Sequence, residues 1–400
     1  MVHVNWRSAC RAAAWLLACA ALLVGCGGGV DSGGTGNGIY ASGPITGYGS
    51  IVVGGVHYDE STADVQDDDG TPRTPADLQL GMVTEIQASP PMGSASMPTA
   101  TAMAVRYRSE IIGPVSAVST STSTLKVLGQ TVKVTAKTVF DARIVGGLAG
   151  LKANDVVEVY GELDTRARSY TATRIEPRPA DTAAFKLRGL VTAVDTVAGT
   201  LGIGGQAIDV SAIAALPEII AGRTLLRVTL NPQQVAGLWI ATAVEVGARR
   251  VPDREYVELE GRITAFKSIT SFEVDGVPVV TNASTVFPDG PAAIVLGVRV
   301  EAQGRSLDGQ LVAMKVTVQS DSQGGAVPFE ITGSIANGSL DTVAQTFVVR
   351  GFTVHWSATT SFDAGTAANL RAGRRVAVKG ALSADGTRLE AASIRVQVSE

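Results

Sequence analysis

The densest group of potential metal ligands in this 400-residue chain is an acidic segment made of Asp64, Asp67, Asp68, Asp69 and Gly70. Carboxylate oxygens are ligands that Ca²⁺ prefers. An EF-hand loop needs a Glu six residues after its glycine, and Ala76 occupies that position here. The EF-hand motif is therefore absent and no metal is predicted. We interpret the segment as a solvated hairpin tip, with a weak calcium site as the alternative.

The histidines are the next candidates for chemistry. His57 stands beside Tyr58, and His355 stands beside Trp356. A hydrolase would also need an activated nucleophile, and the chain contains neither G-x-S-x-G nor H-E-x-x-H. The two histidines occupy similar strand positions in an internal repeat, so we interpret them as parts of polar strand faces. No catalytic residue and no cofactor site is predicted.

The only cysteine expected in the mature chain is Cys26. It follows two arginines and an apolar run over 12–24, which is too short to span a bilayer and has the layout of a secretory leader. The run ends in Leu-Val-Gly-Cys, which resembles the bacterial lipobox. The resemblance implies diacylglycerol transfer to the Cys26 thiol, cleavage before it and acylation of the new N-terminus. Several acyl chains hold a protein on a membrane where one chain does not.

This interpretation makes 1–25 a lipoprotein signal peptide and 26–40 an acylated, glycine-rich tether. An ordinary cleaved leader with an incidental cysteine is the alternative. Cys10 and Cys19 leave with the leader, so the mature chain forms no internal disulfide. Gly27 rather than Asp follows Cys26, and by resemblance to lipoprotein sorting signals we expect the outer membrane of a bacterial cell envelope.

Composition favours strands and disfavours nucleic acid as a partner. The chain has 45 glycines and only 18 % charged residues, as is typical of proteins with many tight turns. Its formal charge is -4, and removal of Arg7 and Arg11 with the leader leaves 31 basic against 37 acidic residues. Binding to a polyanion needs clustered Lys and Arg, and no such run is present.

The chain contains five copies of one unit, and each copy opens with a glycine and an alternating triplet. The glycines are Gly43, Gly113, Gly189, Gly261 and Gly333, so the intervals are 70, 76, 72 and 72 residues. Such regularity indicates duplication. The predicted repeats are 41–110, 111–181, 182–250, 251–322 and 323–400.

Each repeat is expected to contain three strands, a short helical turn and two more strands. The runs alternate apolar and polar residues, and Asp275-Gly276 and Asp308-Gly309 favour tight hairpins between them. The helical turns are expected at 76–80, 148–151, 212–220, 292–296 and 367–370. The predicted fold is all-β, with five tandem small OB-like β-barrels of about 70 residues. A half-sandwich whose edges are covered by the neighbouring repeat is the alternative.

One segment of the first repeat resembles a known family. Residues 49–59, GSIVVGGVHYD, are followed by Asp68-Asp69-Gly70 and by LQLGMV at 78–83. Together they resemble the DUF5666 family of bacterial lipoproteins. The resemblance implies no established activity.

OB-type barrels often bind polymers through aromatic side chains on the face of strands 2 and 3. Aromatic residues make up only 5 % of this chain, and most are expected to be core fillers: Tyr58, Phe140, Phe272, Phe347 and Trp356. We therefore expect a non-enzymatic envelope lipoprotein, anchored through acylated Cys26, that serves as a scaffold or binding array for an envelope protein or polysaccharide. A glycan-acting enzyme or enzyme accessory is the alternative, and it would need a converging carboxylate pair in a groove.

Overall fold

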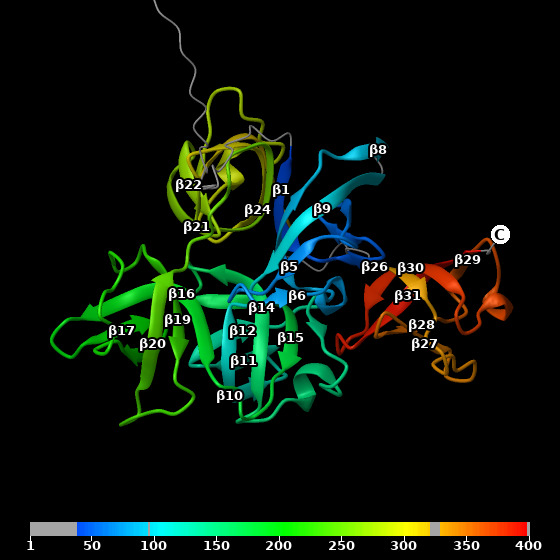
Figure 1. Cartoon of the computed structure of the whole chain (residues 1–400), viewed down its shortest axis with the longest axis horizontal. Coiled ribbons are helices and arrows are strands. Elements are labelled where there is room, and N and C mark those ends of the chain that lie inside the picture. Colours follow the sequence, from blue (N-terminus) through cyan, green and yellow to red (C-terminus); the bar gives the residue numbers. More distant parts are fainter. Residues whose placement is uncertain (1–37, 95–96, 321–328, 398–400) are drawn as a thin grey trace, which may run out of the picture. The chain divides into compact units, whose positions relative to one another are not determined.

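The computed structural model describes residues 38–94, 97–320 and 329–397. Its regular structure is almost entirely β-strand, and each of its helices is one short 3₁₀ turn (Figure 1). The predicted all-β class is therefore confirmed. Within these ranges no helix has the length and apolar character needed to cross a bilayer. Cys26 and the predicted leader lie outside the described residues.

The first two repeats contain fifteen strands and two 3₁₀ turns. Repeat 1 comprises β1 (Ile39–Pro44), β2 (Gly47–Tyr48), β3 (Ile51–Val53), β4 (Val56–Asp59), β5 (Asp64–Gln66), β6 (Pro72–Arg73), η1 (Pro75–Asp77), β7 (Val83–Ala88), β8 (Met92–Ser94) and β9 (Met97–Tyr107). Repeat 2 comprises β10 (Ile111–Ser119), β11 (Thr124–Val127), β12 (Gln130–Lys133), β13 (Val139–Phe140), η2 (Gly147–Gly150), β14 (Val156–Asp164) and β15 (Ser169–Pro177).

The remaining repeats contain strands in a similar order, but repeat 3 has no 3₁₀ turn. Repeat 3 comprises β16 (Phe185–Asp195), β17 (Thr200–Ile203), β18 (Gln206–Asp209), β19 (Leu225–Leu230) and β20 (Trp239–Val246). Repeat 4 comprises β21 (Arg254–Ser268), β22 (Ser271–Val274), β23 (Val277–Val280), η3 (Pro291–Ala293), β24 (Arg299–Leu307) and β25 (Gln310–Val318). Repeat 5 comprises β26 (Phe329–Ser334), β27 (Thr346–Val349), β28 (Phe352–His355), β29 (Ser361–Asp363), η4 (Ala367–Asn369), β30 (Arg375–Leu382) and β31 (Arg388–Val396).

Strand pairing closes each repeat into a small barrel. In repeat 4, β21 pairs antiparallel with β22, β22 with β23 and β24 with β25, while β23 and β25 run parallel. The pairing of β21 with β24 completes the ring, which Figure 1 shows in yellow-green. Repeats 1, 2 and 3 form the same cycle of pairs, with β1 and β2 together as the first strand of repeat 1. In repeat 5 a single bridge between Ile335 and Val349 takes the place of the pairing between the first two strands. Closure leaves few free edges in a strand-rich chain.

A bulge recurs in the fifth strand of three repeats, each time opposite a glycine of the fourth strand, where Thr173, Met314 or Ala392 is the extra residue. The register shifts at Gly161 of β14, Gly304 of β24 and Gly380 of β30. A Cβ atom at these positions would lie 2.3, 2.1 and 2.1 Å from a carbonyl oxygen of the neighbouring strand. Only glycine permits so close an approach of two backbones. Repeats 1 and 3 shift register at the corresponding point without a glycine.

The prediction of a helical turn in every repeat is wrong for repeat 3. Residues 212–220 contain no helix, whereas the other repeats form η1, η2, η3 and η4. Pro217 lies inside the expected turn, where it lacks a backbone N–H and restricts Leu216 to extended conformations, whereas Pro75 and Pro291 occupy the first positions of η1 and η3.

The first strands of the repeats also pair with one another. β1 runs parallel to β21, β2 runs parallel to β26, and β10 pairs antiparallel with β16. Two hydrophobic cores likewise extend across repeats. One is built chiefly from repeats 1 and 5, and another is built from repeats 2 and 3. Backbone ladders and shared cores therefore join barrels that the sequence alone presents as separate units.

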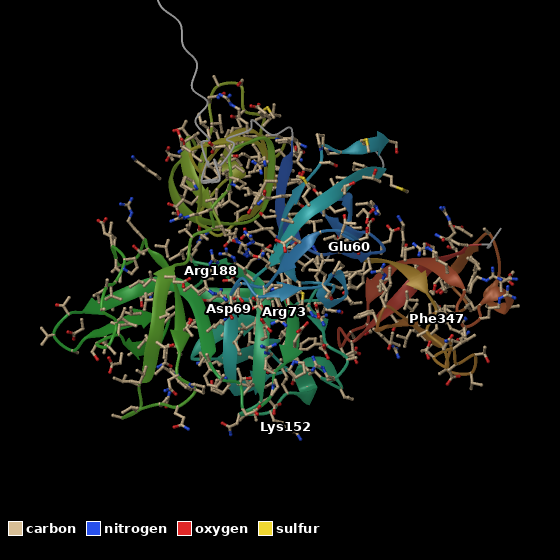
Figure 2. The ribbon with its side chains drawn as sticks, viewed as in Figure 1. Glu60, Asp69, Arg73, Lys152, Arg188 and Phe347 are labelled. Atoms are coloured by element: carbon tan, nitrogen blue, oxygen red, sulfur yellow. The ribbon has the colours of Figure 1, made fainter. Side chains whose placement is uncertain are left out.

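A buried ion network adds to these joints, and Arg188 of β16 lies at its centre (Figure 2). Arg188 Nη1 contacts the two carboxylate oxygens of Glu110 at 3.2 and 3.0 Å, and its Nη2 lies 2.8 Å from Asp275 Oδ1. Arg249 pairs with Asp275 and, at 3.2 Å, with Glu85. The network therefore links residues of repeats 1, 3 and 4 with Glu110 at the joint between repeats 1 and 2.

Candidate functional site

A groove of about 600 Å³ lies over the first hairpin of repeat 4. Strands β21, β22 and β23 form its base, and a loop of repeat 2 together with β16 and a loop of repeat 3 form its walls. Its lining residues are Thr165, Arg168, Leu190, Thr192, Gly222, Arg223, Thr264, Ala265, Phe266, Lys267, Ser271, Phe272, Glu273, Pro278, Val279, Leu296 and Gln310. Its volume lies in the range typical of ligand-binding clefts.

A pair of phenylalanines supplies the apolar surface of this groove. Phe266 and Phe272 are cross-strand partners whose rings stack at 6.3 Å between centroids with 26° between planes. Phe272 is 3 % exposed and belongs to the core, whereas Phe266 is 38 % exposed. The register of β21 shifts on both sides of Phe266, and such bulges redirect side chains. The groove thus presents one aromatic ring to solvent.

Charged and polar side chains surround that ring. Arg168, Arg223 and Lys267 are exposed cations that line the groove, and Glu273 is the single carboxylate among the lining residues. Burial raises the pKa of Glu273, and Arg223 opposes that shift. Thr165 Oγ1 donates a hydrogen bond to the Thr264 carbonyl at 2.8 Å, which ties the wall from repeat 2 to the base. The site combines a flat apolar face with net positive charge.

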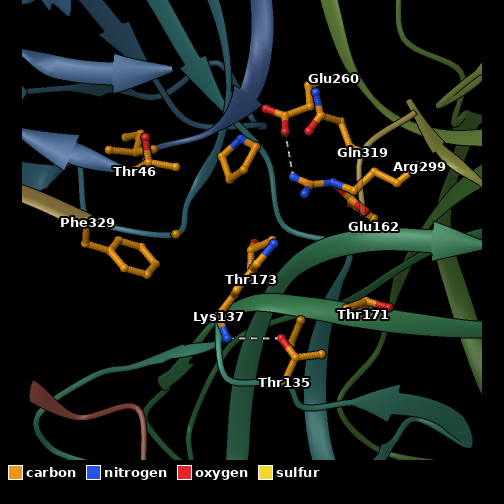
Figure 3. A pocket seen from close by; sticks show the side chains of 14 residues that line it. Thr46, Thr135, Lys137, Glu162, Thr171, Thr173, Glu260, Arg299, Gln319 and Phe329 are labelled. Atoms are coloured by element: carbon orange, nitrogen blue, oxygen red, sulfur yellow. Dashed lines mark hydrogen bonds and ion pairs between the residues drawn. The ribbon is translucent and has the colours of Figure 1, made fainter. Parts of the chain in front are cut away.

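A second cavity of about 110 Å³ is lined by residues of repeats 1, 2, 4 and 5 (Figure 3). Two carboxylates that line it, Glu162 and Glu260, share Arg299 as a partner at 2.6 and 2.8 Å. Arg262 contacts Glu162 at 3.3 Å. Burial raises the pKa of Glu260, and Arg299 opposes that shift. Both carboxylates are therefore engaged in ion pairs within the wall.

The acidic segment of repeat 1 makes intramolecular ion pairs, although Asp64, Asp69 and Gly70 are exposed. Asp67 pairs with Arg73 at 2.7 Å, and both Asp69 and Arg73 are labelled in Figure 2. Burial acts to raise the pKa of Asp67, but the hydrogen bonds from Arg73 and from backbone N–H groups outweigh it and lower the pKa. Asp68 and Asp69 both pair with Lys186 of β16.

Asp68 also pairs with Arg227 of β19, and its side chain is 8 % exposed. One carboxylate oxygen from each of Asp67, Asp68 and Asp69 lies within 4.8 Å of the other two, so one metal ion placed between them would contact all three. Lys186 and Arg227 already supply positive charge there, and a calcium ion would have to displace it. The sequence shows the cluster of carboxylates directly, but Lys186 and Arg227 are more than 100 residues away and their contact with it could not be predicted.

The two histidines lie in separate surroundings. His57 Nδ1 lies 3.4 Å from Ser50 Oγ, and His355 Nδ1 lies 2.5 Å from Glu390 Oε2. Neither residue lines the groove or the second cavity. The five aromatic residues predicted to fill cores are all buried: Tyr58, Phe140, Phe272, Phe347 and Trp356. Phe266 was missed, and its only sequence signal is the break in alternation at Phe266-Lys267-Ser268.

Comparison with known proteins identifies a family in three repeats. The model of "Domain of unknown function (DUF5666)" matches residues 112–176, 260–317 and 332–395. These segments fall in repeats 2, 4 and 5, the three repeats in which a glycine of the fourth strand lies opposite the bulge. The segment 49–83, on which the resemblance to this family was based, is not among the matched residues.

A solved structure of drosophila Unr CSD456 is similar to 55 % of this chain and to 99 % of its own chain, with 12 % identity and a TM-score of 0.14. No curated protein sequence matches the chain.

Proposed function

Because this chain is a DUF5666 domain-containing repeat protein, we propose that it is a non-enzymatic binding scaffold of the bacterial cell envelope. Cys26, as the acylated N-terminus of the mature chain, anchors it to the outer membrane. Its five barrels are of the OB type. The cycle in which strands 1, 2, 3, 5 and 4 pair in turn, with strands 3 and 5 parallel, supports that assignment.

The observation that carries the proposal is that one groove draws its lining from three repeats. Arg168 comes from repeat 2, Arg223 from repeat 3 and Phe266 from repeat 4. Such a site keeps its geometry only when the barrels are fixed against one another. The β10–β16 ladder and the ions around Arg188 provide that fixation.

The ligand class follows from the chemistry of the groove. Sugar rings present apolar faces that pack on an aromatic ring, and their hydroxyl groups bond to arginine and threonine side chains. Three cations against one carboxylate favour a polymer that also carries acidic groups. The partner proposed is therefore an acidic envelope polysaccharide. A nucleic acid is disfavoured because the chain as a whole is acidic.

Affinity electrophoresis of the full chain tests this proposal. The chain is run in native gels that contain soluble acidic or neutral polysaccharides, together with Phe266→Ala and the control Val343→Ala, whose wild-type side chain is 94 % exposed. We expect retardation by acidic polysaccharides and a loss of affinity of about three- to tenfold for Phe266→Ala alone. Equal mobility in all gels, or retardation that Phe266→Ala leaves unchanged, would refute the proposal.

The alternative of a glycan-acting enzyme is tested in the same experiment. Glu273 is the single carboxylate that lines the groove, and Glu162 and Glu260 of the second cavity are held by Arg299. Release of reducing ends from a retarded polysaccharide would favour the enzyme over the scaffold.

A further inference from the structure

The cavity in Figure 3 has a different character from the groove and shares no lining residue with it. Part of its wall is apolar and rigid: Ile45, Ala172 and Phe329 are 0 %, 1 % and 5 % exposed. Its volume of about 110 Å³ is well below that of a cleft for a polymer. The space suits a compact molecule of a few heavy atoms.

Lys137 brings a positive charge to this cavity. Its Nζ donates a hydrogen bond to the Ser320 carbonyl at 3.4 Å, and no described ion pair joins it to a carboxylate. The two negative charges in the wall already face two cations, because Arg262 and Arg299 pair with Glu162 and Arg299 also pairs with Glu260. The cavity therefore has an excess of positive charge at Lys137.

A hydroxyl group beside this charge lacks a partner. Thr173 Oγ1 is buried and makes no hydrogen bond to any described residue. Figure 3 shows Lys137 and Thr173 both pointing into the cavity, across from the ring of Phe329. A buried hydroxyl without an acceptor is unfavourable, so an oxygen placed in the cavity would satisfy it.

We infer that this cavity is a binding site for a small organic anion, a carboxylate with a compact apolar body. The carboxylate accepts hydrogen bonds from Lys137 Nζ and Thr173 Oγ1. The apolar body packs against Ile45, Ala172 and Phe329. The site gives the protein a small-molecule ligand in addition to the polymer of the groove, and it does not depend on polymer binding.

Saturation-transfer NMR on the full chain tests the inference, with benzoate as the probe. Benzyl alcohol is the neutral analogue of similar shape, and benzylammonium is the cationic one. We expect benzoate to bind with a dissociation constant of about 1 mM or tighter. Benzyl alcohol should bind at least several-fold more weakly, and benzylammonium should show no saturable binding.

Two substitutions assign the binding to this cavity. Lys137→Met keeps the length of the side chain and removes its charge, so benzoate affinity should fall about tenfold or more. Lys133→Met is the matched control, because Lys133 is exposed on β12 and does not line the cavity. Thr173→Val should weaken benzoate several-fold while raising the Tm of the free protein, since it removes the unpartnered hydroxyl.

Absence of saturable benzoate binding would overturn the inference. So would equal affinity for benzoate and benzyl alcohol, or equal losses in Lys137→Met and Lys133→Met. Since the groove variant Phe266→Ala should bind benzoate as the wild type does, failure of the polymer proposal would leave this result unaffected.

Discussion

Replacing Arg188 by methionine should destabilise the joints between repeats. Arg188 is 3 % exposed and makes two contacts to Glu110 and one to the Asp275 carboxylate, at 3.2, 3.0 and 2.8 Å. It also donates to the carbonyls of Gly247 at 2.6 Å and Asp275 at 3.1 Å. Burial acts to lower the pKa of Arg188, but Asp275 and Glu110 outweigh it and raise the pKa, so the side chain stays charged.

The magnitude follows from what the substitution leaves behind. Asp275 keeps Arg249 as a partner, but the buried Glu110 loses its bidentate ion pair. Removing one partner of a buried ion pair costs about 3–5 kcal/mol, a large part of the 5–15 kcal/mol by which a folded protein is typically stable. We expect the free energy of unfolding of Arg188→Met to fall by about 3–5 kcal/mol.

Urea unfolding followed by circular dichroism measures that loss, and hydrogen exchange locates it. Exchange should rise in β10 and β16, whose ladder runs beside Arg188, more than in β30 and β31 of repeat 5. The double variant Arg188→Met with Glu110→Leu removes both charges and should recover most of the loss. Arg371→Met, at an exposed position, should change stability by less than about 0.5 kcal/mol.

Two results would refute this reasoning. A loss below about 1 kcal/mol in Arg188→Met would mean that the ions contribute little to the joint. A double variant no more stable than Arg188→Met would mean that packing, not an unpaired buried charge, causes the loss.

Glu258→Gln should raise stability at alkaline pH only. Burial and Glu301 raise the pKa of Glu258 from 4.5 to about 7. The native state therefore binds this proton more tightly than the unfolded chain does. Because of that difference, wild-type stability falls as pH rises from about 4.5 through about 7. Urea unfolding should show a gain for the variant of about 2–3 kcal/mol at pH 8 and almost none at pH 4; parallel pH profiles would contradict this. Asp68→Asn should weaken the contact with Lys186 and Arg227 at a cost of about 2–4 kcal/mol and speed hydrogen exchange over 64–73. Calcium should leave the Tm of the wild type unchanged, and a calcium-dependent rise would contradict the ion-pair interpretation of the acidic segment.

The strands of each barrel were predictable because they follow a period of two. Runs rich in apolar residues at 225–230 and 239–246, for example, correspond to β19 (Leu225–Leu230) and β20 (Trp239–Val246). Alternation identifies which residues face a core, and inward-facing side chains fix the register. The helical turns were less predictable, since Pro217 prevents one in repeat 3.

The contacts between barrels were not predictable from the same pattern. Lys186 and Arg188 alternate with apolar residues in β16, as solvent-facing residues do, yet they are 7 % and 3 % exposed. Alternation separates the inside of a barrel from its outside, but it does not tell whether another repeat covers the outside. Charged residues in a first strand, such as Lys186 and Arg188, were the available signal, but their partners lie in loops and other strands: Asp68, Asp69, Glu110 and Asp275.

The groove was partly predictable. The face of strands 2 and 3 was the expected place for a ligand, and Phe272 was named there as a core residue. Phe266 reaches the surface through register shifts that depend on hydrogen-bond geometry and leave little trace in composition. Arg168 and Arg223 reach the groove from other repeats. A site assembled from three repeats is not visible in any one of them.

The buried charges give a physical reason for one arrangement among five similar barrels. Apolar outer faces would pair almost indiscriminately, because the hydrophobic effect has no direction. A buried charge accepts only a partner of opposite sign at hydrogen-bond distance, and a wrong pairing leaves it unmatched at high cost. Arg188 of repeat 3 meets Glu110, at the joint between repeats 1 and 2, and Asp275 of repeat 4 in one arrangement of these repeats. The same arrangement brings Arg168, Arg223 and Phe266 to one groove, so the pairing of charges and the assembly of the binding site depend on each other.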